Sequence, residues 1–338
     1  MRAAAIFGLR SSWKDVEPFA REGAIITQAG TPPAKADAVL IFGGDGTVNR
    51  HLPKLLEHEV PTLVVPAGSG NDFARAIGFA NVEDTLSAWH RFVRGEGNVR
   101  AVDVGVISTS TTETRRHGAE LLERHLSAAP RERSGITTAD HVRSGITTAD
   151  RVRSGIATAV QSITGNTRVE PTTRLFCCVG GAGFDSETNR RANALPSWMR
   201  AHGGYVIAAA RTLATWKPIQ MKVELPDKGL TLDEPTSFVV FANAPSYGDG
   251  MRIAPHAVLD DGLLDVCFVR GTSRARITRH FASIYSGSHL SLREVEYFQV
   301  SRLRVETEQP IDVYADGEYM CRTPIDVSVR PKAFKVIC

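Results

Sequence analysis

The sequence predicts a protein of two domains, in which an α/β domain built on a parallel, doubly wound sheet precedes an antiparallel β-sandwich. Three observations lead to this prediction. The chain has 338 residues, which is long for one domain. A unit of strand, glycine-rich loop and helix occurs twice in succession from Val39, which is typical of a parallel sheet. From Arg174 onward, short apolar runs are broken by Gly, Pro or Asp, as in a sandwich.

The first unit starts with the apolar run VLIF (residues 39–42), continues through the loop GGDG and enters a helix near Thr47. Apolar residues follow at helical spacing, which indicates one buried helix face. Pro53 is expected to weaken this helix, because its missing amide would have bonded the carbonyl of Asn49. The loop also places an acid, Asp45, among its glycines.

The second unit repeats this order from Thr62, with TLVV as the strand and PAGSG as the loop. Asn71 and Asp72 follow as candidate N-caps of the helix FARAIG. Loops that leave the carboxyl ends of neighbouring parallel strands meet at one crevice, where helix N-termini offer free amides to an anion. We therefore expect the two loops to form one anion-binding site.

The two loops do not match the common nucleotide motifs. Neither has the GxxxxGK[ST] pattern of a P-loop, and Phe73 stands where GxGxxG would need its last glycine. Each loop instead carries an aspartate, Asp45 or Asp72, which would repel a bare polyphosphate. We interpret the pair as a site for a nucleotide bound with magnesium. The alternative is that Asp45 only fills a tight turn and Asp72 only caps a helix.

A repeat-bearing segment separates the two predicted domains. Three ten-residue copies begin at Arg133, with the sequences RSGITTADHV, RSGITTADRV and RSGIATAVQS. A ten-residue period is too short for a solenoid unit, so we interpret the segment as a surface loop lengthened by tandem duplication. A helical stack or a binding arm is the alternative. Helical interruptions of the sandwich are expected at residues 203–216 and 274–286. The expected domain boundaries are 1–100 for the α/β domain, 108–172 for the insertion and 173–338 for the sandwich.

Composition narrows the function classes. A formal net charge of +3 with 23% charged residues is too small for a nucleic-acid partner to be expected. No window reaches the roughly 18 consecutive apolar residues of a membrane-spanning helix, and the apolar run at residues 3–7 is shorter than a secretory core. These features predict a soluble, cytoplasmic protein. Five cysteines without a CxxC pair are expected to be reduced core thiols.

Two loop sequences, GGDGTVNR (residues 43–50) and PAGSGNDFAR (66–75), resemble the signature loops of the diacylglycerol kinase catalytic-domain family, whose bacterial members phosphorylate lipids. The resemblance continues in order through GGAGFDSE (180–187), IAPHAVLDDGLLDV (253–266) and ADGE (315–318). These five matches span most of the chain outside the repeats. The resemblance implies an N-terminal phosphofructokinase-like nucleotide domain and a C-terminal β-sandwich that receives the lipid, with the active site in the cleft between them.

The resemblance also implies a nucleotide site. Asp45 and Asp72 would belong to a network of magnesium and water, and Ser69 stands where the family usually has threonine. The residues expected to bind the nucleotide are Gly43, Gly44, Asp45, Gly46, Thr47, Val48, Asn49, Gly68, Ser69, Gly70, Asn71 and Asp72.

Two further sites follow from the resemblance. Asp261, with the backbone carbonyls of Val258 and Leu263, corresponds to a structural magnesium site, and such oxygen donors suit that cation. Asp316 and Glu318 correspond to the acids offered as the general base, and in an alternating strand they would project to the same face. Without the resemblance, the Asp-Gly pair would predict a hairpin turn.

The implied function is the ATP-dependent phosphorylation of a lipid hydroxyl, most simply of diacylglycerol to phosphatidic acid, with ATP as co-substrate and Mg2+ as cofactor. One alternative is a soluble-metabolite kinase such as an NAD kinase, which shares the GGDGT loop but has Asn-Glu where this chain has Asn71 and Asp72. Another is a catalytically inactive relative that binds nucleotide or lipid. The N-terminal loop GLRSSW, which begins at Gly8, departs from the family's Asn-Pro-x-Ser/Ala-Gly form and puts the affinity for ATP in question.

The expected partner is a lipid at the membrane surface, and the resemblance specifies no oligomeric state. The basic stretch RGTSRARITRHF (residues 270–281) could lay the protein on an anionic bilayer. More commonly such a stretch is a solvated helix face. The sequence therefore predicts a cytoplasmic protein with peripheral contact at the inner face of the membrane.

Overall fold

The structure is a computed structural model that describes residues 1–20, 24–109, 173–195, 204–248 and 250–338. The three copies of the ten-residue repeat, and the predictions about their conformation, lie outside these described residues. None of the described helices is long and apolar enough to cross a membrane.

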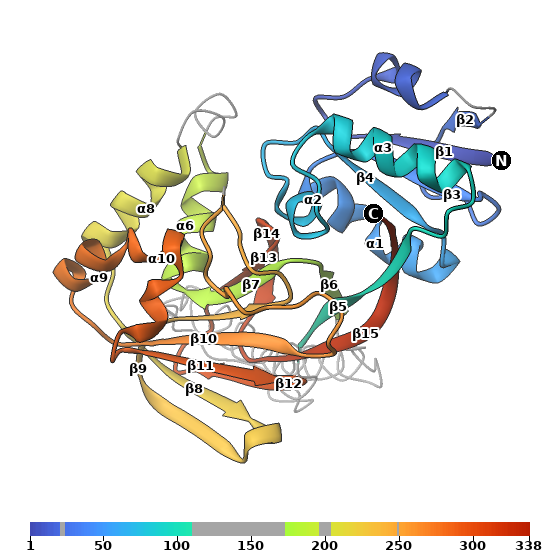
Figure 1. Ribbon diagram of the computed structural model, residues 1–338. Coiled ribbons are helices and arrows are strands. Elements are labelled where there is room, and N and C mark those ends of the chain that lie inside the picture. Colours follow the sequence, from blue (N-terminus) through green and yellow to red (C-terminus); the bar gives the residue numbers. More distant parts are fainter. Residues whose placement is uncertain (21–23, 110–172, 196–203, 249) are drawn as a thin grey trace, which may run out of the picture. The chain divides into compact units, whose positions relative to one another are not determined.

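The N-terminal part is a parallel sheet whose strand order is β2, β1, β3, β4 (Figure 1). Every residue of β3 is buried, because the strand lies in the middle of the sheet and helices cover it. This arrangement confirms the predicted α/β domain. Its elements are β1 (Arg2–Phe7), η1 (Trp13–Ala20), β2 (Ile25–Gln28), β3 (Ala38–Gly43), α1 (Asp45–His58), β4 (Thr62–Pro66), α2 (Asp72–Ala76) and α3 (Val82–Val93).

Helix α1 packs its predicted apolar face inward, with Val48, Leu52 and Leu55 at 1% exposure or less. It also runs through Pro53, where weakening was expected. Pro53 lies on the exposed face of the helix, so burial of the opposite face outweighs the loss of one backbone hydrogen bond. The first turn of α1 therefore stays aligned with the loops at the edge of the sheet.

Two long strands, β5 (Val99–Thr109) and β15 (Ile325–Ile337), connect the N-terminal sheet to the C-terminal part. They pair in antiparallel orientation, and their register shifts between Arg330 and Phe334. Beyond this irregularity, Val336 of β15 pairs in parallel with Thr62 of β4. The parallel sheet thus receives its next strand from a segment more than 250 residues along the sequence.

The C-terminal part is an antiparallel, sandwich-like assembly of strands, which confirms the predicted second fold. An apolar core of this part contains Phe176, Phe241 and Phe268, all fully buried. The apolar stretch LFCCV (residues 175–179) is divided at Cys177 and Cys178, which lie between two strands. The strands are β6 (Thr173–Phe176), β7 (Val179–Gly183), β8 (Ile219–Leu225), β9 (Leu230–Ala242), β10 (Leu264–Arg270), β11 (Val295–Val300), β12 (Arg302–Thr307), β13 (Asp312–Ala315) and β14 (Glu318–Arg322).

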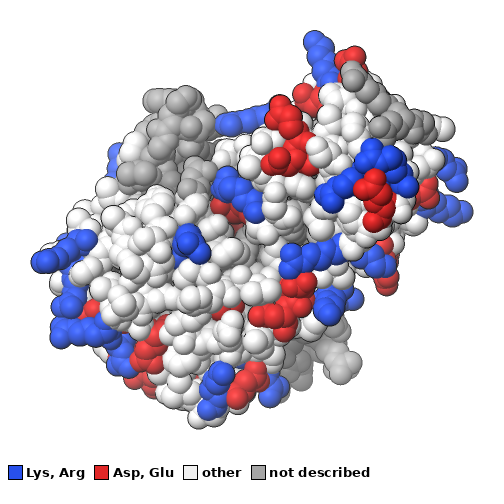
Figure 2. Space-filling view, in the orientation of Figure 1, with Lys and Arg blue, Asp and Glu red and all other residues white. Residues whose placement is uncertain are grey.

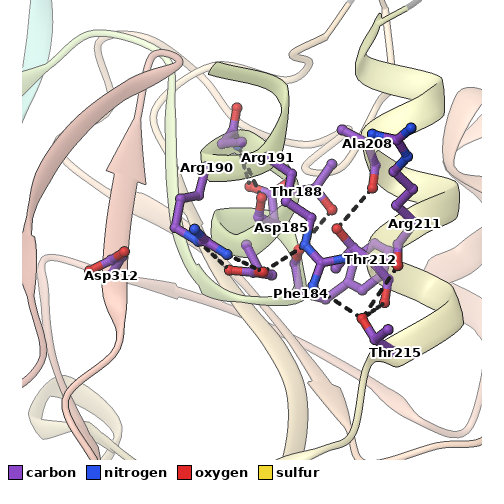
Figure 3. A network of polar contacts seen from close by, with 12 residues as sticks. Phe184, Asp185, Thr188, Arg190, Arg191, Ala208, Arg211, Thr212, Thr215 and Asp312 are labelled. Carbon is purple, nitrogen blue, oxygen red and sulfur yellow. Dashed lines mark hydrogen bonds and ion pairs between the residues drawn. The ribbon is translucent and has the colours of Figure 1, made fainter. Parts of the chain in front are cut away.

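Helices occupy one end of this part (Figure 1); those within residues 204–215 and 274–286 lie where the sequence predicted them, whereas the helix at 184–193 was not predicted. Arg191 of α6 links that helix to α8, because it donates to the Arg211 carbonyl at 2.9 Å and to Oγ1 of Thr215 at 3.1 Å (Figure 3). Glu187 accepts from Arg191 and holds it in place. The helices are α6 (Phe184–Asn193), α8 (Gly204–Thr215), α9 (Arg274–His280) and α10 (Ser283–Ser286), with short 3-10 turns η2 (Pro226–Lys228) and η3 (Ser288–Ser291).

The basic stretch around α9 is largely engaged within the protein. Arg270 forms ion pairs with Glu234 and Glu296, and Arg276 lies 2.8 Å from Glu294. Arg274 donates to backbone carbonyls at the end of α8. Figure 2 shows basic and acidic side chains interspersed over the visible face. Membrane contact through this stretch therefore stays a prediction, with fewer cations available than the sequence suggested.

Candidate active site

The carboxyl ends of β1, β3 and β4 meet at one edge of the parallel sheet, which confirms the predicted meeting of the loops after β3 and β4 and adds the loop after β1 to them. The Gly8 amide after β1 donates to the Phe42 carbonyl at 2.8 Å. The Asp45 amide after β3 donates to the Gly70 carbonyl at 3.2 Å. The three loops are therefore joined by their own backbones, and together they surround the N-terminus of α1.

The loops after β3 and β4, which are the two glycine loops of the sequence, touch backbone to backbone at Gly44 and Gly68. A Cβ atom on Gly44 would lie 2.2 Å from the Gly70 carbonyl oxygen, and one on Gly68 would lie 2.4 Å from the Cα of Gly44. Contacts this short leave no room for any side chain. Glycine is required at both positions because of this close approach.

Asp45 holds the two loops together through its side chain. Its carboxylate accepts hydrogen bonds from the amides of Asp72 at 3.0 Å and Phe73 at 2.9 Å, which are the first two amides of α2. Burial of the Asp45 carboxyl, followed by the negative charges of Asp72 and Asp316, raises its pKa to about 7. Asn71 is the N-cap residue of α2, as predicted, but its side chain makes no cap hydrogen bond, and the Asp45 carboxylate from the neighbouring loop accepts from the first amides instead.

The side chains of Asn71 and Asp72 have other partners. Asn71 closes the second loop on itself, with its carboxamide accepting from the Gly68 amide at 3.0 Å and donating to the Gly68 carbonyl at 3.2 Å. Asp72 is 6% exposed, and it accepts from Arg75 at 2.6 Å and from the amide of Gly248 at 2.9 Å. Because Gly248 belongs to the C-terminal part, Asp72 joins the second glycine loop to that part.

The other predicted nucleotide residues lie around the same loops with different exposures. Ser69 is exposed at the tip of its loop. The Thr47 side chain lies against Gly43 and Gly8, where a Cβ on Gly8 would be 2.9 Å from its Oγ1. The Val48 side chain is buried in the core, so only its backbone could face a ligand. The Gly46 amide has no hydrogen-bond partner among the described residues.

Asp316 and Glu318 lie on a hairpin rather than along one strand. Asp316 and Gly317 have φ angles of 50° and 78°, the left-handed conformations of a tight turn between β13 and β14. The expectation that alternation puts both acids on the same face was therefore wrong. Asp316 turns inward, whereas Glu318 begins β14 and is exposed.

The Asp316 carboxylate is held by four donors. It accepts from the backbone amides of Cys177 at 2.7 Å, Cys178 at 2.9 Å and Val179 at 3.2 Å. The side-chain amide of Asn49, on α1, donates to it at 3.2 Å. Burial raises the pKa of Asp316, and these hydrogen bonds oppose the rise. The carboxylate thus fixes the bend between β6 and β7 and attaches it to α1.

Glu318 reaches the first turn of α1 from the C-terminal part. A Cβ atom added to Gly46 would lie 2.8 Å from Oε1 of Glu318. Among the described residues, no group hydrogen-bonds to this carboxylate. Glu318 is therefore the acid at this site whose oxygens are open to a ligand.

The predicted cation loop lies apart from these acids, in the C-terminal part. Asp261 is exposed, and its carboxylate accepts from the Leu263 amide at 3.0 Å. The described residues contain no group of three or more His, Cys, Asp or Glu side chains that could hold a metal. A cation at this loop would therefore depend on the Asp261 carboxylate and on backbone carbonyls, such as those of Val258 and Leu263.

Two structural acids were missed by the sequence reasoning. Asp103 on β5 is fully buried and accepts from the amides of Gly262 and Lys332, both at 2.6 Å. Its signal was an isolated acid within the apolar strand AVDVGV. Asp185 is 6% exposed and accepts from the Tyr247 hydroxyl at 2.9 Å, next to the Gly248 amide that bonds Asp72.

Comparisons with known proteins match both parts of the chain. Residues 13–107 match the family described as the diacylglycerol kinase catalytic domain, and residues 178–338 match the YegS C-terminal NAD kinase beta sandwich-like domain. The diacylglycerol kinase of Mycobacterium tuberculosis (strain ATCC 25618 / H37Rv) is 28% identical over 301 residues, which are 89% of this chain and 76% of that protein. The diacylglycerol kinase of Bacillus subtilis (strain 168) is 21% identical over 286 residues, 84% of this chain and 71% of that protein.

A solved structure shares the fold. The crystal structure of a diacylglycerol kinase from Bacillus anthracis str. Sterne aligns with a TM-score of 0.57 and 14% identity, covering 99% of this chain and 96% of that chain. At this identity the likeness concerns the arrangement of helices and strands alone.

Proposed function

Because this chain belongs to the kinase family that combines a diacylglycerol kinase catalytic domain with a YegS C-terminal domain, we propose that it transfers the γ-phosphoryl group of ATP to a lipid hydroxyl. Diacylglycerol is the proposed acceptor and phosphatidic acid the product, since the two relatives described above are diacylglycerol kinases. The observation that carries the proposal is the open carboxylate of Glu318 beside the glycine loop of α1.

The ATP phosphates are proposed to lie against the start of α1. The first amides of a helix have no intrahelical acceptor, and the helix dipole favours negative charge there. The Gly46 amide has no partner among the described residues, so it is available to a phosphate oxygen. Gly44 and Gly68 keep the backbone bare of side chains at this point, which lets a phosphate approach closely.

Magnesium fits the chemistry of the acids at these loops, because it prefers carboxylate oxygens and water as ligands. Asp45 and Asp72 are the proposed residues that would hold it through water, since their oxygens already accept protein hydrogen bonds. Bound with ATP, magnesium would supply neutralisation of the phosphate charge. A second, structural cation is proposed at Asp261 with the carbonyls of Val258 and Leu263.

Glu318 is proposed as the general base and Asp316 as a positioning residue. Glu318 would accept the proton of the acceptor hydroxyl while the hydroxyl oxygen bonds to the γ-phosphorus and the bond from that phosphorus to ADP breaks. Asp316 is less suited to this step, because its oxygens accept from three backbone amides and from Asn49. It would instead keep the β6 to β7 bend in register with α1.

The proposal is tested by incubating the purified protein with magnesium, γ-labelled ATP and a total bacterial lipid extract, and then identifying the labelled lipid. Labelled phosphatidic acid, formed in proportion to added diacylglycerol, is the expected result. Label in a soluble metabolite added in parallel would favour a soluble-metabolite kinase. Stabilisation by ATP without any turnover would favour a catalytically inactive relative. Either of these results would overturn the assignment as a lipid kinase.

A further inference from the structure

A cavity of ≈ 560 Å³ lies beside α1, at the junction of the N-terminal and C-terminal parts. One wall is α1, and the others come from β6, β14 and β15. Asn49 and Glu57 line it on the helix, so it follows α1 for eight residues, or ~12 Å at 1.5 Å per residue. It begins one turn beyond the glycine loop and extends away from it.

Three arginines line this cavity from three different elements: Arg50 on α1, Arg174 on β6 and Arg330 on β15. Among the described residues, none of the three forms an ion pair or a side-chain hydrogen bond. The one carboxylate on the wall, Glu57, is already paired with Lys54 at 2.7 Å. The cavity therefore carries positive charge that the described protein does not neutralise.

Arginines elsewhere in the described structure show the contrast. Arg100 pairs with Asp260 at 2.6 Å through two hydrogen bonds, and Arg304 pairs with two carboxylates. These two arginines are matched with acids, whereas the three at the cavity have no ion pair with a described residue. Guanidinium groups converging from separate elements are the chemistry that recognises phosphate, because the planar fork donates two parallel hydrogen bonds to its oxygens.

We propose that this cavity is a second binding site, which takes a phosphate-bearing anion. The phosphate group bound in this cavity is distinct from the ATP phosphates. The ATP phosphates are placed at the start of α1, whereas the cavity lies along later residues of that helix, from Asn49 to Glu57. Tyr319, which is half exposed and also lines the cavity, offers a hydroxyl and an aromatic face to the same ligand. The phosphate belongs either to an anionic lipid headgroup or to a free phosphate compound.

The insertion is a poor occupant on charge grounds. Its residues 110–172 contain nine arginines and seven carboxylates, so they bring no acidic excess to a cavity lined by arginines. The proposal concerns binding alone, so its test does not depend on whether the protein transfers phosphoryl groups.

The test compares two full-length triple variants that lose the same charge. The cavity variant carries Arg50→Gln, Arg174→Gln and Arg330→Gln. The control variant replaces exposed arginines elsewhere that also have no ion pair with the described residues, namely Arg2→Gln, Arg211→Gln and Arg252→Gln. Circular dichroism and urea unfolding establish that both variants fold like the parent.

One arm measures co-sedimentation with phosphatidylcholine vesicles with and without phosphatidylglycerol, at fixed ionic strength and without ATP. The other measures the thermal unfolding midpoint in inorganic phosphate against chloride at matched ionic strength. The cavity variant is expected to bind the anionic vesicles or the inorganic phosphate roughly tenfold or more weakly than the parent, while the control variant binds both as the parent does. A loss on vesicles identifies a lipid headgroup, and a loss with inorganic phosphate identifies a free phosphate. If neither arm separates the cavity variant from the control, or the parent binds neither probe, the proposal is overturned.

Discussion

The side-chain amide of Asn49 donates a 3.2 Å hydrogen bond to the carboxylate of Asp316, 267 residues further along the chain. The same amide donates to the Leu175 carbonyl at 2.9 Å. At the start of α2, the Gly248 amide donates to the Asp72 carboxylate at 2.9 Å. Each glycine loop or its helix is thus fastened to the C-terminal part by a buried carboxylate, and the site depends on both parts.

Glu318→Gln should lower kcat by at least about 100-fold, because a general base typically contributes 10²–10⁴-fold. ATP binding should stay unchanged, since the substitution removes a proton acceptor and no backbone amide. The assay is the initial rate of lipid labelling, with ATP affinity measured by thermal shift. Glu308→Gln, at another exposed acid, is the matched control. A kcat within about twofold of the parent would remove Glu318 from the mechanism.

Asp316→Asn should destabilise the protein by about 3 kcal/mol, because one carboxamide oxygen cannot accept from all four donors. Urea unfolding measures this change. The pH dependence of kcat tells positioning from catalysis: if Asp316 only positions, the acidic limb of the profile stays where the parent has it. Loss of that limb in Asp316→Asn would make Asp316 the base instead.

Asp45 should make stability depend on pH. Its pKa rises from the ordinary 3.8 to about 7 in the folded state, so between these values the folded protein retains a proton that the unfolded chain releases. Stability should therefore fall as pH rises from about 4 to 7 and then level off. For Asp45→Asn, the free energy of unfolding measured in urea should lack this fall between pH 5 and pH 8. Parallel slopes for parent and variant would contradict the pKa assigned to Asp45.

Gly44→Ala should disrupt the contact between the two glycine loops, because its Cβ would lie 2.2 Å from the Gly70 oxygen. A loss of about 1–3 kcal/mol is expected from such overpacking, together with weaker stabilisation by ATP and magnesium. Gly30→Ala is the control, since a Cβ there meets nothing within 4 Å. Equal unfolding midpoints and equal ATP-induced shifts in the two variants would refute the close approach.

The sequence predicted features that rest on local pattern. The apolar runs of β3 and β4, each followed by glycines, gave the parallel sheet and the meeting of the two loops. The inward turn of Asp316 was not predictable in the same way, because it depends on amides more than 130 residues away. The capping of α2 by Asp45 likewise requires the packing of one loop on the other, whereas Asn71 and Asp72 offered a local cap in the sequence.

During translation, the sheet of the N-terminal part stays open at β4 until Val336 has left the ribosome, because that residue supplies the pairing opposite Thr62. The nascent chain therefore lacks the pairing at the Thr62 end of the β4 edge while the sandwich is being made. A chain released before β15 would expose that edge, and we expect such fragments to aggregate rather than to fold as a separate nucleotide domain.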